Sequence, residues 1–407
     1  MFLQSSNKTV SSNHKRQVFK YFLSFLFIFL FIFSAVGAFA QSDSNTDEDQ
    51  PREKVMEGIV RSRLKLPCKN TVEQTQCDFV KVVLTADGRE VNIQITDDLN
   101  SGLIINRDWK ENDRVIVVET PKADGTQDYY IRDPDRQLVL WALLAFIVIV
   151  AVLVAGFRGI MALLALVLST VVIFSVFIPQ ALSGGNLWLW GFVSTLIILV
   201  INQFIGHGFS KISFIGMLSG LLTLITAWIL GWISVWLFRV TGGGSDNIVF
   251  VRDYVENVKN SKIDFTGLYL VGVMIGAVGA IDDVVAAQSS TVTELISTNR
   301  LMKFSELYSK SMRVGREHIV SMINTLFLAY AGTSLPLLMI FATSLNESIM
   351  HLLSREDMTE EIIRTAVGST ALLFVVPLST FCAALFYKRP IWLENYINKR
   401  IKPLFKS

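Results

Sequence analysis

Two adjacent carboxylates, Asp282 and Asp283, end a glycine-rich apolar stretch within the segment GAVGAIDDVVAAQSSTVTEL, residues 276–295. A carboxylate inside a bilayer is costly, and such acids usually face a cavity, a charged partner or a substrate path. Small and polar residues recur here at helical spacing and form one stripe: Gly272, Gly276, Gly279, Asp283, Ser290 and Glu294. Glycines four residues apart let another helix approach closely. We therefore expect this face to pack against protein and to carry Asp283 into a protein interior or a polar cavity.

The helical phase separates the two acids. Asp282 lies about 100° around the helix from Asp283 and is expected to point elsewhere, near the membrane interface. This assignment predicts that Asp283→Asn harms the protein more than Asp282→Asn. A structural role is the alternative, because acids close to the inner interface can simply pair with Lys310, Arg313 or Arg316 of the following basic segment.

The next apolar segment, RVGREHIVSMINTLFLAYAGTSLPLL, residues 313–338, brings further polar groups toward the same side. His318 titrates near neutrality and can carry a proton, although an interfacial histidine is more often merely solvated. Asn324 can line a site or can hydrogen bond between helices. Pro336 has no N–H and its ring clashes with the carbonyl of Gly332, which predicts a kink within the span.

The sequence therefore predicts one polar site and one set of packing or hinge residues. The candidate ion, proton or substrate site comprises Asp282, Asp283, Glu294, His318 and Asn324, and the packing or hinge residues are Gly272, Gly276, Gly279, Gly332 and Pro336. Asn202, Gln203 and His207 end an earlier apolar segment on the same expected side and can join the site. No metal site, catalytic residue or cofactor is predicted.

The composition defines the class of protein that must position these groups. Hydrophobic residues make up 51% of the 407 residues and the mean hydropathy is +0.46, which is too apolar for a soluble protein. The net charge is only +2 and the basic residues are dispersed, which argues against nucleic-acid binding. Residues 1–40 have the basic, apolar and small-residue regions of a secretory signal peptide, with an uncleaved signal anchor as the alternative.

Residues 41–137 are expected to form a small extracytoplasmic all-β domain, either a barrel, which would include an OB-like one, or a sandwich. Strand-like runs cover residues 55–66, 79–85, 90–96, 114–119 and 129–132. Asp87-Gly88 between two of these runs is a strong hairpin signal. Cys68 and Cys77 can form a disulfide in an exported compartment, with two free thiols as the alternative.

Residues 138–387 are expected to form a seven-helix transmembrane domain, followed by a basic cytoplasmic tail at residues 388–407. The apolar stretches are residues 138–157, 160–178, 187–205, 212–238, 265–285, 319–344 and 366–387. If residues 41–137 lie outside, the basic residues concentrate in the inner loops and the tail. This distribution obeys the positive-inside rule and predicts a cytoplasmic C-terminus.

The motifs GAVGAIDDVVAAQSSTVTEL and ELYSKSMRVGREHIVSMINTLFLAYAGTSLPLL, together with the order of the parts, resemble the YibE/F family of bacterial multi-pass membrane proteins. The resemblance is specific over residues 272–341 and concerns only the architecture elsewhere. Within the matching motif, Asp283 carries the resemblance better than Asp282. The resemblance implies a location in the bacterial plasma membrane, but it implies no biochemical activity.

Two functions from different classes fit these features. The first is a permease-like protein for a small solute or ion with a carboxylate site on the cytoplasmic side. The second is a non-catalytic envelope scaffold whose β domain binds a partner. An enzyme is not expected, because only one Asp-Asp pair is present and neither an HExxH nor a GxSxG motif occurs. The expected partners are the lipid bilayer, a small solute or ion, and an envelope protein or a second copy of the chain.

Overall fold

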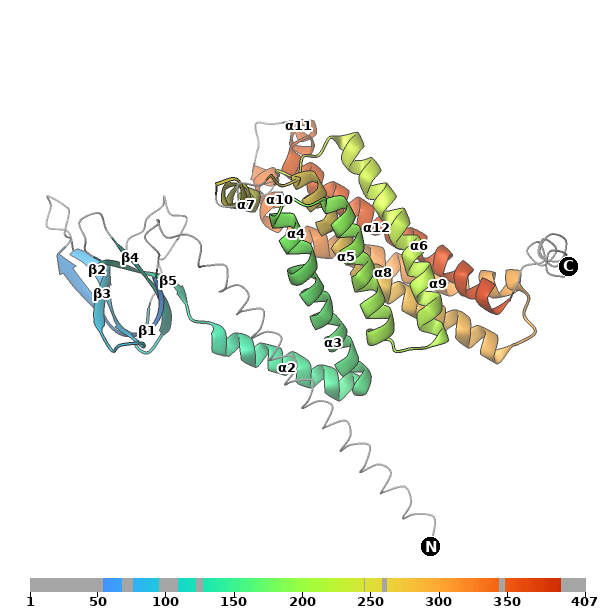
Figure 1. The fold of residues 1–407 in the computed structure, drawn as a ribbon, viewed down its shortest axis with the longest axis horizontal. Helices are drawn as coiled ribbons and strands as arrows, with labels where there is room; N and C mark the ends of the chain where they lie inside the picture. Colours follow the sequence, from blue (N-terminus) through green and yellow to red (C-terminus); the bar gives the residue numbers. More distant parts are fainter. Residues whose placement is uncertain are drawn as a thin grey trace, which may run out of the picture. The chain divides into compact units, whose positions relative to one another are not determined.

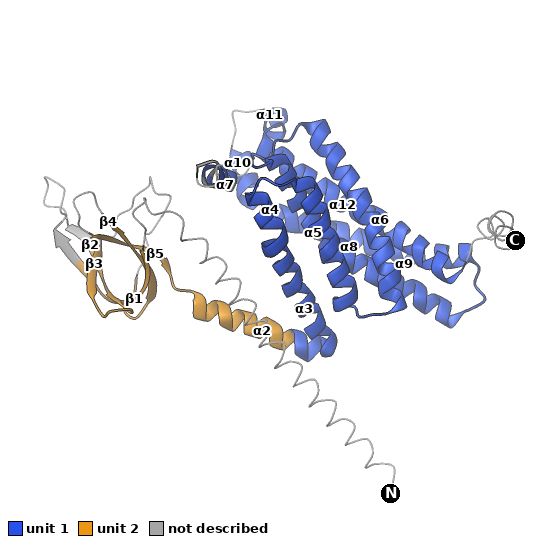
Figure 2. Cartoon of the chain, viewed as in Figure 1, with its two compact units in different colours: residues 1–36, 151–407 blue, residues 37–150 orange. Residues whose placement is uncertain are grey.

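The computed structural model describes residues 54–67, 76–94, 109–121, 127–244, 246–257, 262–343 and 348–388. Contacts divide the chain into two compact units, residues 37–150 and residues 1–36 with 151–407 (Figure 2). The predicted signal peptide, Cys68 and nearly all of the predicted tail lie outside the described residues. The side chain of Cys77 does too, so the predicted disulfide stays a prediction.

Residues 37–150 contain one antiparallel five-stranded sheet in the order β3-β2-β1-β4-β5 (Figure 1). The strands are β1 (Lys54–Pro67), β2 (Gln76–Leu84), β3 (Glu90–Gln94), β4 (Arg114–Pro121) and β5 (Gln127–Pro134). All five predicted strand runs are confirmed. The predicted hairpin is confirmed as well, because Asp87 and Gly88 lie between the paired strands β2 and β3 and Gly88 adopts a φ of 72°.

The sheet is a curled half-barrel with its own apolar core. Alternate residues of β2, Val80, Val82 and Leu84, point into this core, which Trp109 also enters. The register of β1 shifts between Val60 and Ser62, and such a bulge increases the local bend and twist of a strand. Because the edge strands β3 and β5 approach each other, the described residues form one closing sheet and not a two-sheet sandwich.

The helices begin with α2 (Gln137–Ala155), which crosses the boundary between the two units. The remaining helical elements are α3 (Phe157–Val172), η2 (Ile173–Phe177), α4 (Ile178–Leu182), α5 (Leu187–Ile201), η3 (Asn202–Gly206), α6 (Lys211–Phe238), α7 (Asp246–Asn257), α8 (Phe265–Thr298), α9 (Phe304–Thr333), α10 (Leu335–Thr343), α11 (Ile349–Leu353) and α12 (Glu356–Tyr387). Within the described residues, six helical segments are long and apolar enough to cross a membrane, or seven if the bent pair α9 and α10 counts as one span. The chain is thus a mainly helical, multi-pass membrane protein.

Several helices extend beyond the apolar stretches that predicted them. The prediction ended the fifth stretch at residue 285 and began the last two at residues 319 and 366, whereas α8 continues to Thr298, α9 starts at Phe304 and α12 starts at Glu356. Hydropathy detects the part of a helix that can lie in hydrocarbon, whereas hydrogen bonds and tertiary contacts continue the helix into polar sequence.

The predicted kink before Pro336 is confirmed. The α9 helix ends at Thr333, the α10 helix begins at Leu335, and their axes differ by 69°. Proline cannot donate the hydrogen bond that would continue the α9 helix, so the chain changes direction at this point.

Two helices, α8 and α12, form the centre of the bundle (Figure 1). The α12 helix packs against α6, α8 and α9, and α8 also packs against α5 and α6. Glycines permit some of these close approaches. An added Cβ would lie 2.1 Å from Val271 at Gly191 and 2.5 Å from Leu270 at Gly231.

The predicted glycine packing face on α8 is wrong. An added Cβ would meet no described atom within 4 Å at Gly272 or Gly279, and at Gly276 it would meet only the hydroxyl of Tyr330, at 3.1 Å. The face that packs carries larger apolar side chains, among them Leu270 and Met274, whose burial removes more surface from water. The glycine face is left open.

The separate core of the sheet predicts that residues 41–137 fold on their own. Val80 is 0% exposed and Val55 is 56% exposed, so the same substitution separates core from surface. We expect Val80→Ala to lower the free energy of unfolding by about 2 kcal/mol and Val55→Ala to change it by less than about 0.5 kcal/mol. Urea denaturation followed by circular dichroism measures both values. Equal effects of the two substitutions would contradict the assigned core.

Candidate functional site

Two carboxylates of the described spanning helices are buried, Glu360 of α12 and Asp282 of α8, and we place the candidate site at Asp282. Its side chain belongs to the buried face of α8, with 8% of the residue exposed. Gln203 donates a hydrogen bond from Nε2 to Asp282 Oδ1 at 2.6 Å, and His207 Nε2 lies 3.6 Å from Asp282 Oδ2. A carboxylate, an amide and an imidazole from two different segments therefore meet at one point.

The two acids have the opposite roles from those predicted. Asp282 is buried, whereas Asp283 is exposed on the open glycine face. The reason is the phase of the helix: Val278 and Ile281 turn α8 toward the bundle, and Asp282 follows at the edge of their face. The expectation that Asp282 would point away from the protein was wrong.

Gln203 reaches Asp282 because a glycine leaves room for its amide. The residue lies in the π-helical segment η3 at the end of α5 and is 1% exposed. An added Cβ at Gly216 of α6 would lie only 2.3 Å from Gln203 Oε1. The α6 helix thus supplies a gap, η3 supplies the amide, and α8 supplies the carboxylate.

A cavity of about 360 Å³ borders this cluster. Its walls come from α3, the π segments, α5 and α8, and its lining residues are Ala162, Ala165, Leu166, Ser169, Thr170, Ile173, Ile198, Asn202, Gly206, His207, Ile275, Gly279, Asp282 and Asp283. Gly279 and Asp283 place the open face of α8 along this cavity. Most of the wall is apolar with a few polar groups on it, as is common for small-ligand sites.

Two π-helical segments contribute to the wall. Ile173 begins η2 after α3, and Asn202 and Gly206 begin and end η3 after α5. A π turn inserts one extra residue into a helix and is frequent at functional sites. Ser169 donates a hydrogen bond to Asn202 Oδ1 at 3.1 Å, which joins the two broken helices.

His207 lies one residue beyond its spanning segment and is exposed, with 39% of its side chain accessible. The Asp282 carboxylate stabilises the imidazolium and raises the pKa of His207 above its ordinary value, against the opposing effect of burial. Asp283 adds a smaller attraction of the same sign. The imidazole therefore binds a proton more readily than an isolated histidine does.

The other predicted site residues do not join this cluster. Glu294 of α8 and His318 and Asn324 of α9 are exposed, and none of them lines the cavity. The polar groups that meet Asp282 come instead from the end of α5, a segment that the sequence marked only through the run Asn202, Gln203 and His207. Gln203 could not be singled out from the sequence alone, because a single glutamine at the end of a helix is common in proteins.

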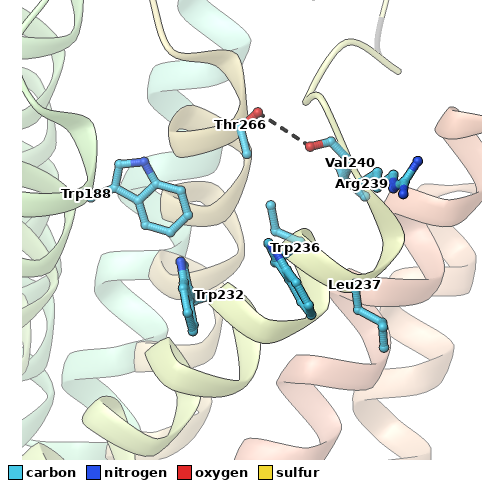
Figure 3. A pocket seen from close by; sticks show the side chains of 8 residues that line it. Trp188, Trp232, Trp236, Leu237, Arg239, Val240 and Thr266 are labelled. Atoms are coloured by element: carbon cyan, nitrogen blue, oxygen red, sulfur yellow. Dashed lines mark hydrogen bonds between the residues drawn. The ribbon is translucent and has the colours of Figure 1, made fainter.

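A larger cavity of about 600 Å³ lies at the C-terminal end of α6 (Figure 3). It is lined by Trp188, Trp232, Val235, Trp236, Leu237, Arg239, Val240 and Thr266. Tryptophan is enriched where spanning helices reach the membrane surface. The described lining holds no carboxylate or imidazole, so we place the candidate site at the smaller, polar cavity.

A glycine-rich loop joins helices at the same end of the bundle as this larger cavity. The N–H of Thr241 donates to Glu356 Oε1 at 2.7 Å, and the N–H of Gly244 donates to Glu360 Oε1 at 2.9 Å. The hydroxyl of Tyr269 donates to the carbonyl of Glu360 at 2.6 Å. These bonds tie the C-terminal side of α6 and the start of α8 to the start of α12.

Fold and site together define a multi-pass membrane protein in which a buried carboxylate, paired with an imidazole, borders a cavity among the spanning helices. Residues 143–389 match the family described as YibE/F-like protein, and the chain belongs to this family. No curated protein matches the chain, and no solved structure matches it.

The gap at Gly216 yields a test of the cluster. We expect Gly216→Ala to displace the Gln203 amide and to destabilise the protein by about 1–3 kcal/mol. Gly272→Ala is the control, because a Cβ there meets open space and removes a flexible helical glycine. Denaturant unfolding in detergent measures both. An unchanged stability of Gly216→Ala would contradict the packing of Gln203.

The raised pKa of His207 predicts a pH dependence with a defined sign. A raised folded-state pKa stabilises the protein fully below the ordinary value of 6.5, and the stabilisation is lost as the pH rises through the folded-state value. We therefore expect wild type to exceed His207→Gln in melting temperature most at mildly acidic pH. The difference should shrink as the pH rises beyond neutrality. Melting curves over this pH range, compared with His318→Gln, measure it, and a gap that widens at alkaline pH would contradict the pairing.

Proposed function

We propose that this protein is a permease-like membrane protein that moves a proton or small cation, alone or coupled to a small solute. The supporting observation is the buried Asp282 carboxylate, which borders a cavity among spanning helices and has both an amide and an imidazole as partners. Intramembrane acids in such positions commonly belong to ion or proton pathways.

Asp283 and Asp282 are suited to two successive steps, the attraction of a cation and its binding. Asp283 is exposed on the cavity wall and attracts a cation from water, whereas Asp282 is the deeper ligand. A proton on His207 and a cation at Asp282 compete, because both neutralise the same carboxylate. Release of the proton from His207 therefore favours cation binding, and cation release favours reprotonation.

The neighbouring backbone suits a change of conformation. The π segments η2 and η3 interrupt two helices of the cavity wall, and a π turn can revert to an α-helix by shifting one residue. Such a shift would move Gln203 and His207 relative to Asp282. The bonds from the glycine-rich loop to Glu356 and Glu360 would keep the other end of the bundle closed meanwhile.

The orientation of the chain in the membrane is part of the proposal. The excess of basic residues in alternate loops supports an extracytoplasmic sheet and a cytoplasmic C-terminus. In that orientation the loop at Thr241 and Gly244 lies at the outer end, and the cavity lies toward the cytoplasmic half of α8. The arrangement corresponds to a carrier that is closed to the outside.

Flux in proteoliposomes tests the proposal. Proton movement is followed with an internal pH-sensitive dye while sodium, potassium or magnesium gradients are imposed. We expect a flux from wild type that falls at least about tenfold in Asp282→Asn, because a charge-assisted hydrogen bond and the binding charge are lost. The expected effect of Asp283→Asn is smaller, and Glu294→Gln is the matched control on the same helix. Absence of gradient-dependent flux in wild type, or full flux in Asp282→Asn, would reject the proposal.

A further inference from the structure

The cavity beside Asp282 changes character along its length. One end carries the carboxylates of Asp282 and Asp283 and the imidazole of His207. The other end is lined by one isoleucine from each of three helical elements: Ile173 of η2, Ile198 of α5 and Ile275 of α8. The cavity is therefore amphipathic, and a ligand that fills it must be amphipathic as well.

The helices α3 and α5 bring two of these isoleucines to the same level. The two helices are joined through η2, α4 and a short turn, and they run antiparallel (Figure 1). The hydrogen bond from Ser169 to Asn202 connects them at one level. Ile173 follows Ser169 by four residues, about 6 Å along its helix. Ile198 precedes Asn202 by the same number, so both isoleucines lie on the side of that bond away from His207.

The third isoleucine reaches this level because α8 runs parallel to α5. An added Cβ at Gly191 of α5 would lie 2.1 Å from Val271. Farther along both helices, Gln203 at the end of α5 bonds to Asp282. Ile275 lies between these two contacts and precedes Asp282 by seven residues, about 10 Å along α8. The three isoleucines thus close the cavity about 10 Å from the carboxylate.

The polar end of the cavity suits an ammonium group. An ammonium with three hydrogens needs three acceptors, and the carboxylates of Asp282 and Asp283 and the Oδ1 atom of Asn202 supply them. Dehydrated Mg²⁺ and Ca²⁺ take six or more oxygen ligands. Within the residues that the structure describes, no three acidic, histidine or cysteine side chains lie close enough together to hold a metal ion.

The volume of the cavity calls for an apolar body on that ammonium. At about 360 Å³ the cavity has the volume of roughly twelve water molecules, at about 30 Å³ each, which is far more than an ammonium group fills. Water against the three isoleucines gains little, whereas burial of each CH₂ group there is favourable. A charged group at that end would lose its hydration without a partner.

We propose that the cavity binds a primary alkylammonium. Its head lies between Asp282 and Asp283, and its alkyl chain extends about 10 Å along α8 to Ile173, Ile198 and Ile275. The inference rests on the proposed function, for which it names the cation as an aliphatic amine.

Binding of radiolabelled n-alkylammonium ions to the full chain in nanodiscs tests the proposal. We expect the affinity to rise about three- to fourfold for each CH₂ group from propylammonium to hexylammonium. The diammonium ion of 1,6-diaminohexane is the matched control ligand, because its second charge would lie against the isoleucines. It should bind at least about tenfold more weakly than hexylammonium.

Two substitutions assign the head and the chain to their ends of the cavity. Asp282→Asn should weaken binding of all these ions at least about tenfold, and the binding that remains measures partition into lipid. Ile275→Trp fills the apolar end, so it should remove the dependence on chain length while propylammonium still binds. Ile229→Trp is the control, because Ile229 of α6 is 52% exposed and does not line the cavity.

The outcomes separate this inference from the proposed function. Equal affinities for hexylammonium and the diammonium ion, or chain-length dependence that persists in Ile275→Trp, would overturn the inference. Flux of protons or metal cations without alkylammonium binding would overturn it as well, while leaving the proposed function intact. Alkylammonium binding without any gradient-dependent flux would confirm the ligand and reject transport.

Discussion

A carboxylate that leaves water inside an apolar bundle must find partners that replace its hydration, and this requirement organises the bundle around Asp282. Gln203 and His207 provide the partners from the end of α5, and the interruption of that helix by η3 places them there. Gly216 then becomes necessary, because any larger residue on α6 would occupy the position of the Gln203 amide. The burial of Asp282 thus constrains how three helices, α5, α6 and α8, pack together.

The same constraint explains why the site has a cavity beside it. The helix α8 turns its large side chains toward α5, α6 and α12 and leaves its glycines and Asp283 on the other side. Small residues on that side create volume, and the apolar walls of α3 and α5 enclose it. A buried acid at the edge of such a volume can exchange its partners for a ligand without disrupting the packed face.

The sequence predicted the elements of the fold better than their orientation. Alternating apolar residues and the Asp87-Gly88 turn were sufficient for the strands, because local pattern and local structure coincide there. Apolar length likewise located the spans, and Pro336 located the bend. Helix ends were missed because polar residues such as those at 286–298 remain helical through contacts that hydropathy does not register.

The assignment of roles within the candidate site failed for a related reason. Helical spacing correctly separated Asp282 from Asp283, but it could not show which face would be buried. Glycines suggested a packing face, whereas the burial of Leu270, Met274 and Ile281 decided the orientation of α8. The partner Gln203 is distant in sequence, and only the folded chain brings it to Asp282.

Cysteine accessibility tests most directly whether the open face of α8 lines a water-filled cavity beside Asp282. In a Cys382→Ser background, Gly279→Cys and Val278→Cys place thiols on the cavity side and on the buried side of the same turn. A small, membrane-impermeant thiol reagent is applied to membranes, and labelling at each position is mapped by mass spectrometry. We expect rapid labelling at position 279 and little at position 278. Labelling at position 278 with protection at position 279 would contradict it.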